Sequence, residues 1–235
     1  RGYYSARKIT QIFEQPMVYI SNNGNIIRHS DGHKDIVSRL LDLDDFRLII
    51  REGQVRELQP IIHVDHYHKG YDIILSRESI DKDYFGGYVQ SHYRYKEVGS
   101  YLDQDIDRVL AMVYPGRQAI LHDFSDYIHE KYPNRFSTHI MENIDMAEGL
   151  FEVMHPQGNK WNGIKEYAES KGIYKDQIIA IGDDNNDSEM IVNAGLGIAM
   201  KNGSGLIKDL ADLVTEKDNN QSGVSHELRK VLGVK

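Results

Sequence analysis

The chain has 235 residues, of which 40% are hydrophobic and 27% are charged, so it is long enough to bury a core without disulfides. It contains no cysteine, which excludes a disulfide scaffold, a cysteine nucleophile and a thiolate metal site. A formal net charge of -8 disfavours a non-specific nucleic-acid binder, and no apolar run approaches the ~20 residues of a membrane span.

The N-terminal part of the chain predicts a helix followed by a hairpin. Residues 3–14 have the apolar spacing of a helix, and Gln15-Pro16 should end it. A short β-rich run at 17–20 comes next. Asn23 and Gly24 then favour a tight turn, because both residue types tolerate a positive φ.

Residues 31–149 differ in composition, being rich in tyrosine, histidine and charge, and they predict an α+β module. Alternating and periodic patterns within this region predict strands at 47–50, 71–75 and 88–95 and helices at 34–43 and 104–113.

From residue 148 onward, strands and helices alternate. The run 177–181 is continuously apolar, as in a strand buried on both faces of a parallel sheet. A helix at 160–170 precedes it, with Gly172 as its C-terminal cap. The other expected elements are strands at 150–154, 196–200 and 212–215 and helices at 187–193, 206–210 and 224–232. This order predicts a doubly wound α/β fold with a parallel sheet.

The strongest candidate for chemistry is the acidic segment from Gly182 to Asp187, which follows the buried strand. Ligands of open α/β sheets bind just past the carboxyl ends of strands. Asp183 and Asp187 carry hard oxygen ligands suited to Mg²⁺, and Asn186 offers an uncharged contact for a phosphate oxygen. Three acids within five positions would repel one another unless they share a cation.

Two other interpretations of this segment have weaker support. A solvated Asx-rich turn would have a similar composition, but such a turn does not require a buried strand before it. An EF-hand loop needs glycine at its sixth position and glutamate at its twelfth, where this chain has Ser188 and Ala194.

Lys160 is a second candidate, because it begins the predicted helix that leads into the acid-bearing strand. A lysine beside the N-terminal amides of a helix can hold a phosphate group. The alternative is an ordinary surface lysine.

These residues resemble motifs of the haloacid dehalogenase superfamily, and most closely those of its Cof-type sugar-phosphate phosphatases. The pattern Gly182-Asp183-x-x-Asn186-Asp187 resembles the fourth motif, and the glycine-rich 194–200 resembles the strand that follows it. Lys160 matches the third-motif lysine, and Asn23-Gly24 resembles the turn after the second motif.

The resemblance implies a Rossmann-like core formed by residues 1–30 and 150–235, with residues 31–149 inserted as an α+β cap. It implies a cytoplasmic, Mg²⁺-dependent phosphatase that acts on small phosphorylated metabolites through an aspartyl-phosphate. It implies neither a nucleic acid nor a membrane as a partner. The specific substrate and the oligomeric state do not follow from the sequence.

The resemblance also implies a role for each matching residue. Asp183 would ligate Mg²⁺, and Lys160 would hold the phosphate and the nucleophile. Asn186 and Asn23 would contact the phosphate. Asp187 would orient Lys160 or complete the metal shell, and it counts with Lys160 as a catalytic candidate.

The family's nucleophile motif, Asp-x-Asp-Gly-Thr, does not occur in this sequence. Residues 42–45 have the Asp-x-Asp spacing, but no Gly-Thr follows, and they are expected at a polar helix end. We therefore expect the nucleophile segment and a central strand of the sheet to precede Arg1. Two other functions stay open: a non-catalytic member that binds a metal or phosphate, and a phosphomutase-type phosphotransferase.

Two clusters of the inserted region have open roles. Two roles are open for the cluster of His63, Asp65, His66 and His68, namely a metal site or a polar face of a strand. In a strand, these side chains would be divided between two faces. Two roles are also open for the tyrosines at 84, 88, 93 and 95 (Tyr84, Tyr88, Tyr93 and Tyr95), which could form an aromatic binding surface or pack on a half-exposed sheet.

Overall fold

A computed structural model describes residues 2–80, 94–144 and 147–234 of the chain. The chain divides into two compact units, Arg1–Gly158 and Asn159–Lys235. Within the described ranges, no helix has both the length and the apolar character needed to cross a membrane. The predicted division into core segments 1–30 and 150–235 around an inserted cap at 31–149 stays a prediction.

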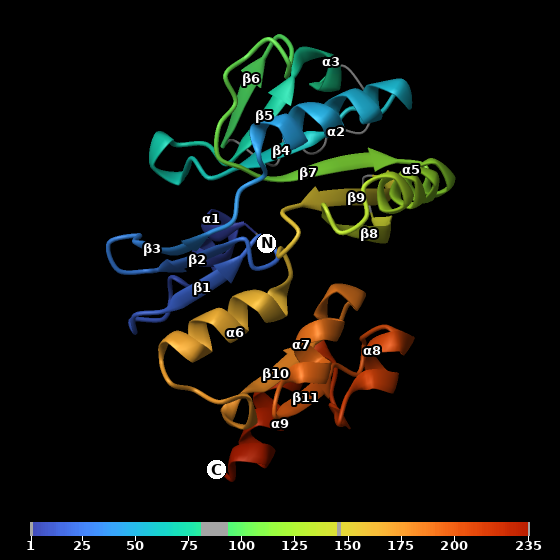
Figure 1. Cartoon of the computed structure of the whole chain (residues 1–235). Coiled ribbons are helices and arrows are strands. Elements are labelled where there is room, and N and C mark those ends of the chain that lie inside the picture. The colour runs from blue at the N-terminus through green and yellow to red at the C-terminus, as the bar shows by residue number, and fades with distance from the viewer. Residues whose placement is uncertain (1, 81–93, 145–146, 235) are drawn as a thin grey trace. The chain divides into compact units, whose positions relative to one another are not determined.

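The first unit begins with a helix and a small antiparallel sheet (Figure 1). These elements are α1 (Tyr3–Thr10), β1 (Val18–Ser21), β2 (Ile26–His29) and β3 (Asp35–Ser38), with the strands in the order β1-β2-β3. Asn23 and Gly24 have φ angles of 49° and 85°, which confirms the predicted turn between β1 and β2.

The helix predicted at 34–43 is wrong. β3 occupies part of that range and pairs with β2, with Ile27 opposite Val37. The next helix, α2 (Leu43–Val55), begins only after Asp42, whose side chain accepts a hydrogen bond from the Asp44 N–H at 2.8 Å. The strand predicted at 47–50 is therefore also wrong, because these residues lie inside α2.

The rest of the first unit is built around a six-stranded sheet with the order β6-β5-β4-β7-β9-β8. Its strands are β4 (Ile61–Val64), β5 (Ile73–Ser76), β6 (Tyr95–Val98), β7 (Val109–Gly116), β8 (Ser137–Ile144) and β9 (Ala147–Met154). The helical segments of this region are η1 (Tyr67–Lys69), α3 (Arg77–Ile80) and α5 (Gln118–Lys131).

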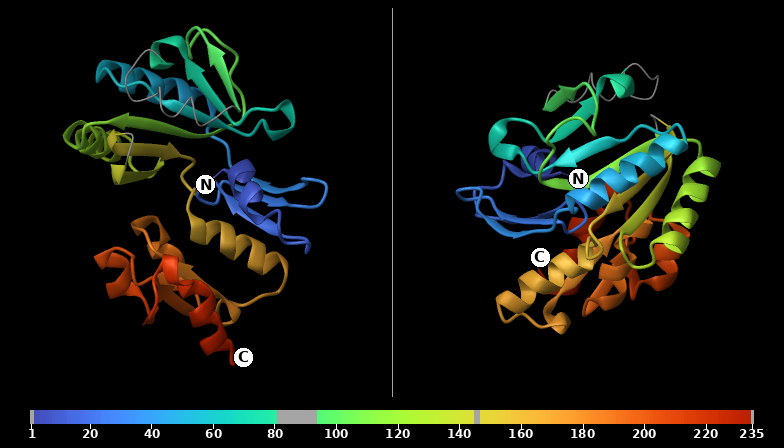
Figure 2. Two further views of the ribbon diagram at one scale, coloured as in Figure 1. Left: turned by 180° about the vertical axis from the view of Figure 1, so that it is seen from behind. Right: turned by 45° about the horizontal axis from the view of Figure 1, so that its top comes forward.

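Helices α2 and α5 cover one face of the six-stranded sheet (Figure 2). The aromatic centre of this core is a row of edge-to-face rings, in which Phe124 lies 5.3 Å from Tyr114 and 5.2 Å from Phe151 between ring centroids. All three rings are fully buried, so they supply much of the apolar surface that holds the helices to the sheet.

Other predictions for this unit had mixed outcomes. The helix predicted at 104–113 is wrong, because β7 begins at Val109 and is buried along its whole length. The strand predicted at 71–75 is confirmed as β5. Most of the strand predicted at 88–95 lies outside the described residues. The strand predicted at 150–154 exists within β9, and it pairs with β7 and β8.

The second unit has the predicted alternation of strands and helices around a parallel sheet with the order β10-β11-β12. Its strands are β10 (Ile179–Gly182), β11 (Leu196–Ala199) and β12 (Leu213–Val214). Its α-helices are α6 (Lys160–Ser170), α7 (Ser188–Asn193), α8 (Gly205–Leu210) and α9 (Gly223–Leu232), and its short 3₁₀ helices are η2 (Lys175–Gln177), η3 (Asn185–Asp187) and η4 (Asn219–Gln221).

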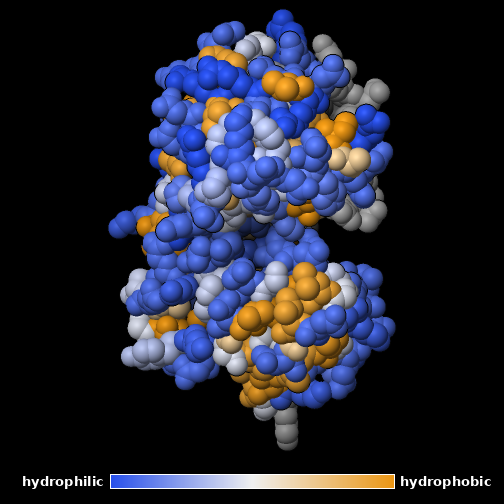
Figure 3. Space-filling view, turned by 45° about the vertical axis from the view of Figure 1, so that its right-hand side comes forward, coloured by the Kyte–Doolittle hydropathy of each residue, from blue (hydrophilic) through white to orange (hydrophobic). Residues whose placement is uncertain are grey.

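Close packing holds α7 against the parallel sheet. Ala180, Ile191, Ala199 and Ile207 form the buried cluster of this unit. An added Cβ at Gly197 would lie 2.1 Å from the Ile191 carbonyl oxygen, so only glycine permits this approach. Apolar side chains also gather on an exposed face of this unit (Figure 3). Among the large hydrophobic residues of the unit, Leu206 is 49% exposed.

Candidate functional site

The acidic loop follows β10 directly, at the carboxyl end of the parallel sheet, as predicted. Gly182 is the last residue of β10, and an added Cβ there would lie 2.5 Å from the Cβ of Asp187. The absence of a side chain at Gly182 therefore allows Asp187 to fold back beneath the loop. The 3₁₀ turn η3 supplies the change of direction that returns the chain to this point.

Asp187 is the anchor of this loop. Its side chain is buried, with the residue 4% exposed, and its Oδ2 accepts hydrogen bonds from the backbone N–H groups of Asp183 at 2.9 Å and Asp184 at 3.1 Å. Its Oδ1 pairs with the ammonium group of Lys160. Both carboxylate oxygens thus accept charge-assisted hydrogen bonds, which are the stronger kind.

Lys160 is the first residue of α6, whose N-cap Asn159 accepts a hydrogen bond from the Asn162 N–H at 2.7 Å. The Lys160 Nζ also donates to Oδ1 of Asn186 at 2.8 Å. The structure therefore brings Lys160, Asn186 and Asp187 together. The Lys160 side chain remains 29% exposed, so the ammonium group is fixed by the protein yet still open to a ligand.

Asp183 differs from Asp187 in its surroundings. Its side chain is exposed, and among the described residues no hydrogen bond or ion pair involves its carboxylate. Its backbone is held by a neighbouring loop, because the Asp183 carbonyl oxygen accepts a hydrogen bond from the Ser204 N–H at 3.0 Å. These contacts hold the backbone of Asp183 in place, while its carboxylate is exposed to solvent.

Sequence reasoning missed the contribution of Ser204. Its hydroxyl donates to Oδ1 of Asn185 at 2.7 Å and accepts a hydrogen bond from the Ile207 N–H at 3.3 Å, so it links the acidic loop to the start of α8. The serine just before a predicted helix was a cap signal. Nothing in the local sequence connected it to the loop after β10.

The oxygen ligands of this loop fit Mg²⁺ only if waters and a substrate phosphate complete its coordination. Mg²⁺ is usually held by one or two carboxylates together with waters and substrate phosphate, rather than by an all-protein cage. Asp183 supplies one open carboxylate. In the part of the chain that the structure describes, no group of three or more histidine or acidic side chains is gathered around a point. Both carboxylate oxygens of Asp187 already accept hydrogen bonds. Its role as a metal ligand stays a prediction.

Asn23 lies in the first unit, on the turn between β1 and β2. Its side-chain amide donates to Oε2 of Glu152 at 2.5 Å and to the sulfur of Met154 at 3.8 Å. These contacts connect the turn to β9. The predicted contact of Asn23 with phosphate stays a prediction.

Among the described residues, the histidine cluster of the first unit does not bring three or more potential metal ligands together. His66 is buried with its Nε2 2.8 Å from the Asp107 carboxylate, whereas His68 is exposed in η1. Asp65 pairs with Arg28 at 2.6 Å and with Arg108. Three of the four singled-out tyrosines, at 84, 88 and 93, lie outside the described residues, and Tyr95 begins β6.

Part of this chain is similar in sequence to curated phosphatases. The chain is 35% identical over 89 residues to the phosphatase YwpJ of Bacillus subtilis, which is 38% of this chain and 31% of that protein. It is 42% identical over 66 residues to a phosphoglycolate phosphatase of Methanosarcina acetivorans, which is 28% of this chain and 29% of that protein. The match thus spans about a third of the length of these curated relatives.

The fold is similar to that of a haloacid dehalogenase-like hydrolase from Bacteroides thetaiotaomicron. The TM-score is 0.79 at 19% sequence identity, and the match covers 98% of this chain and 84% of that one. The sequence profile of haloacid dehalogenase-like hydrolases matches residues 1–228. The chain therefore belongs to the haloacid dehalogenase-like hydrolase family.

Proposed function

We propose that this chain forms part of a Mg²⁺-dependent phosphatase that hydrolyses small phosphate monoesters through an aspartyl-phosphate. The observation that carries the proposal is the placement of the Lys160 ammonium against Asp187 and Asn186, in the loop that also carries the exposed side chain of Asp183. A fixed cation next to a candidate Mg²⁺ ligand is the arrangement that phosphoryl transfer requires.

Each residue of the cluster has a distinct task in this proposal. Lys160 neutralises charge on the phosphoryl oxygens, and Asp187 holds Lys160 in position without itself touching the phosphate. Asn186 carries an amide NH₂, a donor type that a phosphate oxygen accepts. Asp183 would hold Mg²⁺, which supplies further charge neutralisation to the phosphoryl group when it is bound.

The two alternative functions differ from this proposal in measurable ways. A binding protein without a nucleophile would take up Mg²⁺ and phosphate but release no product. A phosphomutase would pass the phosphoryl group to a second acceptor and not to water. The names of the relatives favour the phosphatase, since both reported relatives are phosphatases by name.

The test measures phosphate release by the complete gene product, because the Asp-x-Asp-Gly-Thr motif does not occur in this sequence. A panel of sugar and other small phosphate monoesters is assayed with Mg²⁺ and with a chelator. We expect turnover that requires Mg²⁺, and transfer to an added sugar in place of water would favour the phosphomutase. Binding of Mg²⁺ and inorganic phosphate with no turnover on any substrate would favour the binding protein.

Lys160→Met removes the charge while keeping most of the side-chain volume. We expect kcat to fall by ~100-fold or more, the scale of losing one donor to a developing oxyanion. Lys165→Met is the matched control, because Lys165 lies on the same helix with its side chain 57% exposed. Equal activity of the two variants would remove Lys160 from the phosphate site.

A further inference from the structure

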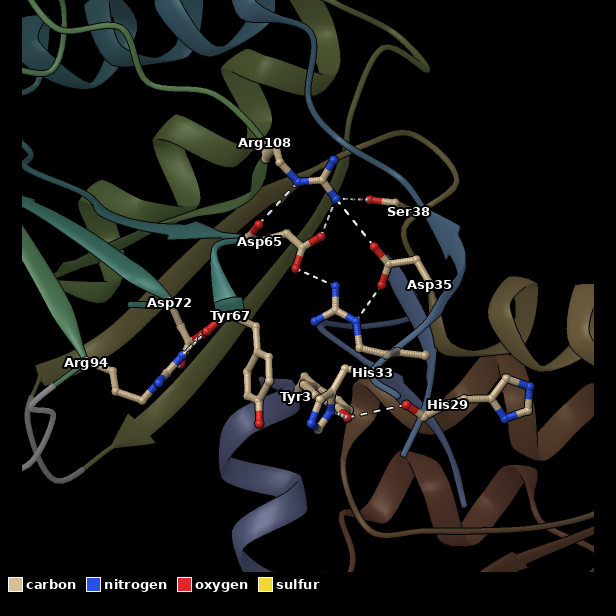
Figure 4. A network of polar contacts seen from close by, with 11 residues as sticks. Tyr3, His29, His33, Asp35, Ser38, Asp65, Tyr67, Asp72, Arg94 and Arg108 are labelled. Carbon is tan, nitrogen blue, oxygen red and sulfur yellow. Dashed lines mark hydrogen bonds and ion pairs between the residues drawn. The ribbon is translucent and has the colours of Figure 1, made fainter. Parts of the chain in front are cut away.

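His33 joins helix α1 to the turn between β2 and β3 (Figure 4). Its φ of +52° follows a φ of +62° at Gly32, and these two left-handed residues turn the imidazole toward α1. The Nδ1 of His33 lies 2.6 Å from the hydroxyl of Tyr3, and its Nε2 lies 3.4 Å from the guanidinium of Arg7. Both of these partners belong to α1.

One neutral tautomer satisfies all of these contacts. The Arg7 guanidinium can only donate, so the His33 Nε2 must present its lone pair to it. The Nδ1–H then donates to the Tyr3 oxygen, and the Tyr3 hydroxyl donates to the His29 carbonyl at 3.4 Å. A second proton on the ring would place an N–H at Nε2 directly against the Arg7 N–H groups.

The charged surroundings of His33 also oppose a second proton. The groups that face it are Arg7 and Tyr3 from α1, Arg28 from β2, Tyr67 and His68 from η1, and Asp31 from its own turn. Burial lowers the pKa of His33 most, followed by the charges of Arg7, His68 and Arg28, and Asp31 acts in the opposite direction.

A buried ion pair lies beneath this contact. Arg28 sits 4.9 Å from the ring centroid of Tyr3 and pairs with Asp65 at 2.6 Å, and their side chains are only 2% and 4% exposed. A cavity of about 20 Å³ adjoins them, large enough for about one water molecule. Release of Tyr3 from this position would therefore open the Arg28–Asp65 pair to solvent.

We propose that His33 is a proton-sensitive latch, in which the neutral imidazole fastens α1 over the Arg28–Asp65 pair and its protonation releases the helix. Above the ordinary pKa of 6.5, the imidazole is neutral whether α1 is docked or not. As the pH falls below that value, the His33 ring takes up a proton more readily when α1 is released than when α1 is docked. Docking therefore weakens until the pH has passed the lowered pKa of the docked state.

The first experiment is amide hydrogen exchange of the complete gene product at pH 7.5 and pH 5.0, corrected for intrinsic exchange. Exchange in α2 of the same unit is the internal reference. We expect the opening of α1 relative to α2 to rise several-fold at pH 5.0, and by about thirtyfold at most, because pH 5.0 lies 1.5 units below the ordinary pKa of 6.5. An unchanged ratio would overturn the latch.

The matched variants are His33→Asn and His68→Asn. Asparagine tolerates the positive φ at position 33 and has no proton to gain, so His33→Asn should abolish the acid response. His68→Asn should retain it. Retention of the full response in His33→Asn would refute the assignment to His33.

A second measurement needs no variant and so does not depend on folding of His33→Asn. NMR titration of the His33 ring in the wild-type protein should give a pKa below 6.5. The neutral ring should carry its hydrogen on Nδ1. Titration at or above 6.5, or a neutral ring with its hydrogen on Nε2, would contradict the latch.

Discussion

Asp187→Asn is the perturbation that most directly tests how the acidic loop is held. Asparagine keeps the shape of the side chain but removes its charge. It can place its oxygen toward the two backbone N–H groups or toward Lys160, but it cannot do both. In either orientation an NH₂ group faces another donor, so hydrogen bonds are lost inside a buried contact.

The expected loss in the free energy of unfolding follows from the burial of this ion pair. Breaking a buried ion pair by removing one partner costs about 3–5 kcal/mol. The Lys160 side chain is 29% exposed, so water can solvate the ammonium group that is left behind, and we expect a loss of ~3 kcal/mol at the low end of that range. For a domain of 60–100 residues, such a loss lowers Tm by roughly 12–24 °C.

The assay uses the fluorescence of Trp161, the single tryptophan of the chain, which lies beside Lys160 on α6 and reports on this unit. Asp183→Asn is the control, because the Asp183 side chain is exposed. It should leave Tm within a few degrees of the wild type while abolishing Mg²⁺-dependent turnover. A stable Asp187→Asn protein together with a strongly destabilised Asp183→Asn protein would refute the roles assigned to the two acids.

Two further predictions concern packing and pH. Gly197→Ala should lower the Trp161-monitored Tm by several degrees, because its Cβ would lie 2.1 Å from the Ile191 carbonyl oxygen, whereas Gly205→Ala adds its Cβ in open space and should leave Tm almost unchanged. In the first unit, burial raises the pKa of Glu52, but hydrogen bonds from two tyrosines and a lysine at the end of α5 outweigh it and lower the pKa below 4.5. The contribution of Glu52 to the free energy of unfolding is therefore fully present above pH 4.5 and is lost as the pH falls through the lowered pKa. In urea unfolding, the free energy of unfolding of Glu52→Gln should fall less steeply at acidic pH than that of the wild type.

The second unit was predictable because its signals are local. The helix predicted at 160–170 matches α6, since Asn159 caps its start and Gly172, with a φ of +67°, follows its end. The run at 177–181 predicted a strand, and β10 begins at Ile179, but the expected burial on both faces is wrong because half-buried and buried residues alternate along β10. The acidic loop after the strand was placed correctly. The order of elements along the chain was enough to place the acidic loop, because its residues lie close in sequence to the strand and the turn that position them.

The first unit was less predictable because its strands depend on distant partners. The turn at Asn23 was found from the Asn-Gly pair, but β3 was mistaken for a helix because its pairing with β2 outweighs local periodicity. The helix predicted at 104–113 extended a polar pattern into β7, whose strand character depends on β4 on one side and β9 on the other. The same limit hid Ser204, whose role depends on a loop nineteen positions away, at Asn185.

The closed geometry of the acidic loop also determines how its two key acids depend on each other. The short segment from Asp183 to Asp187 turns back on itself, so the carboxylate of Asp187 holds the backbone N–H of Asp183 as well as the ammonium of Lys160. Loss of Asp187 would therefore displace both a candidate Mg²⁺ ligand and the phosphate-binding cation. Because Asp187 acts through these groups, its loss should reduce activity even under conditions in which the variant is fully folded. Loss of Asp183, by contrast, removes only an exposed carboxylate and should leave Lys160 in place.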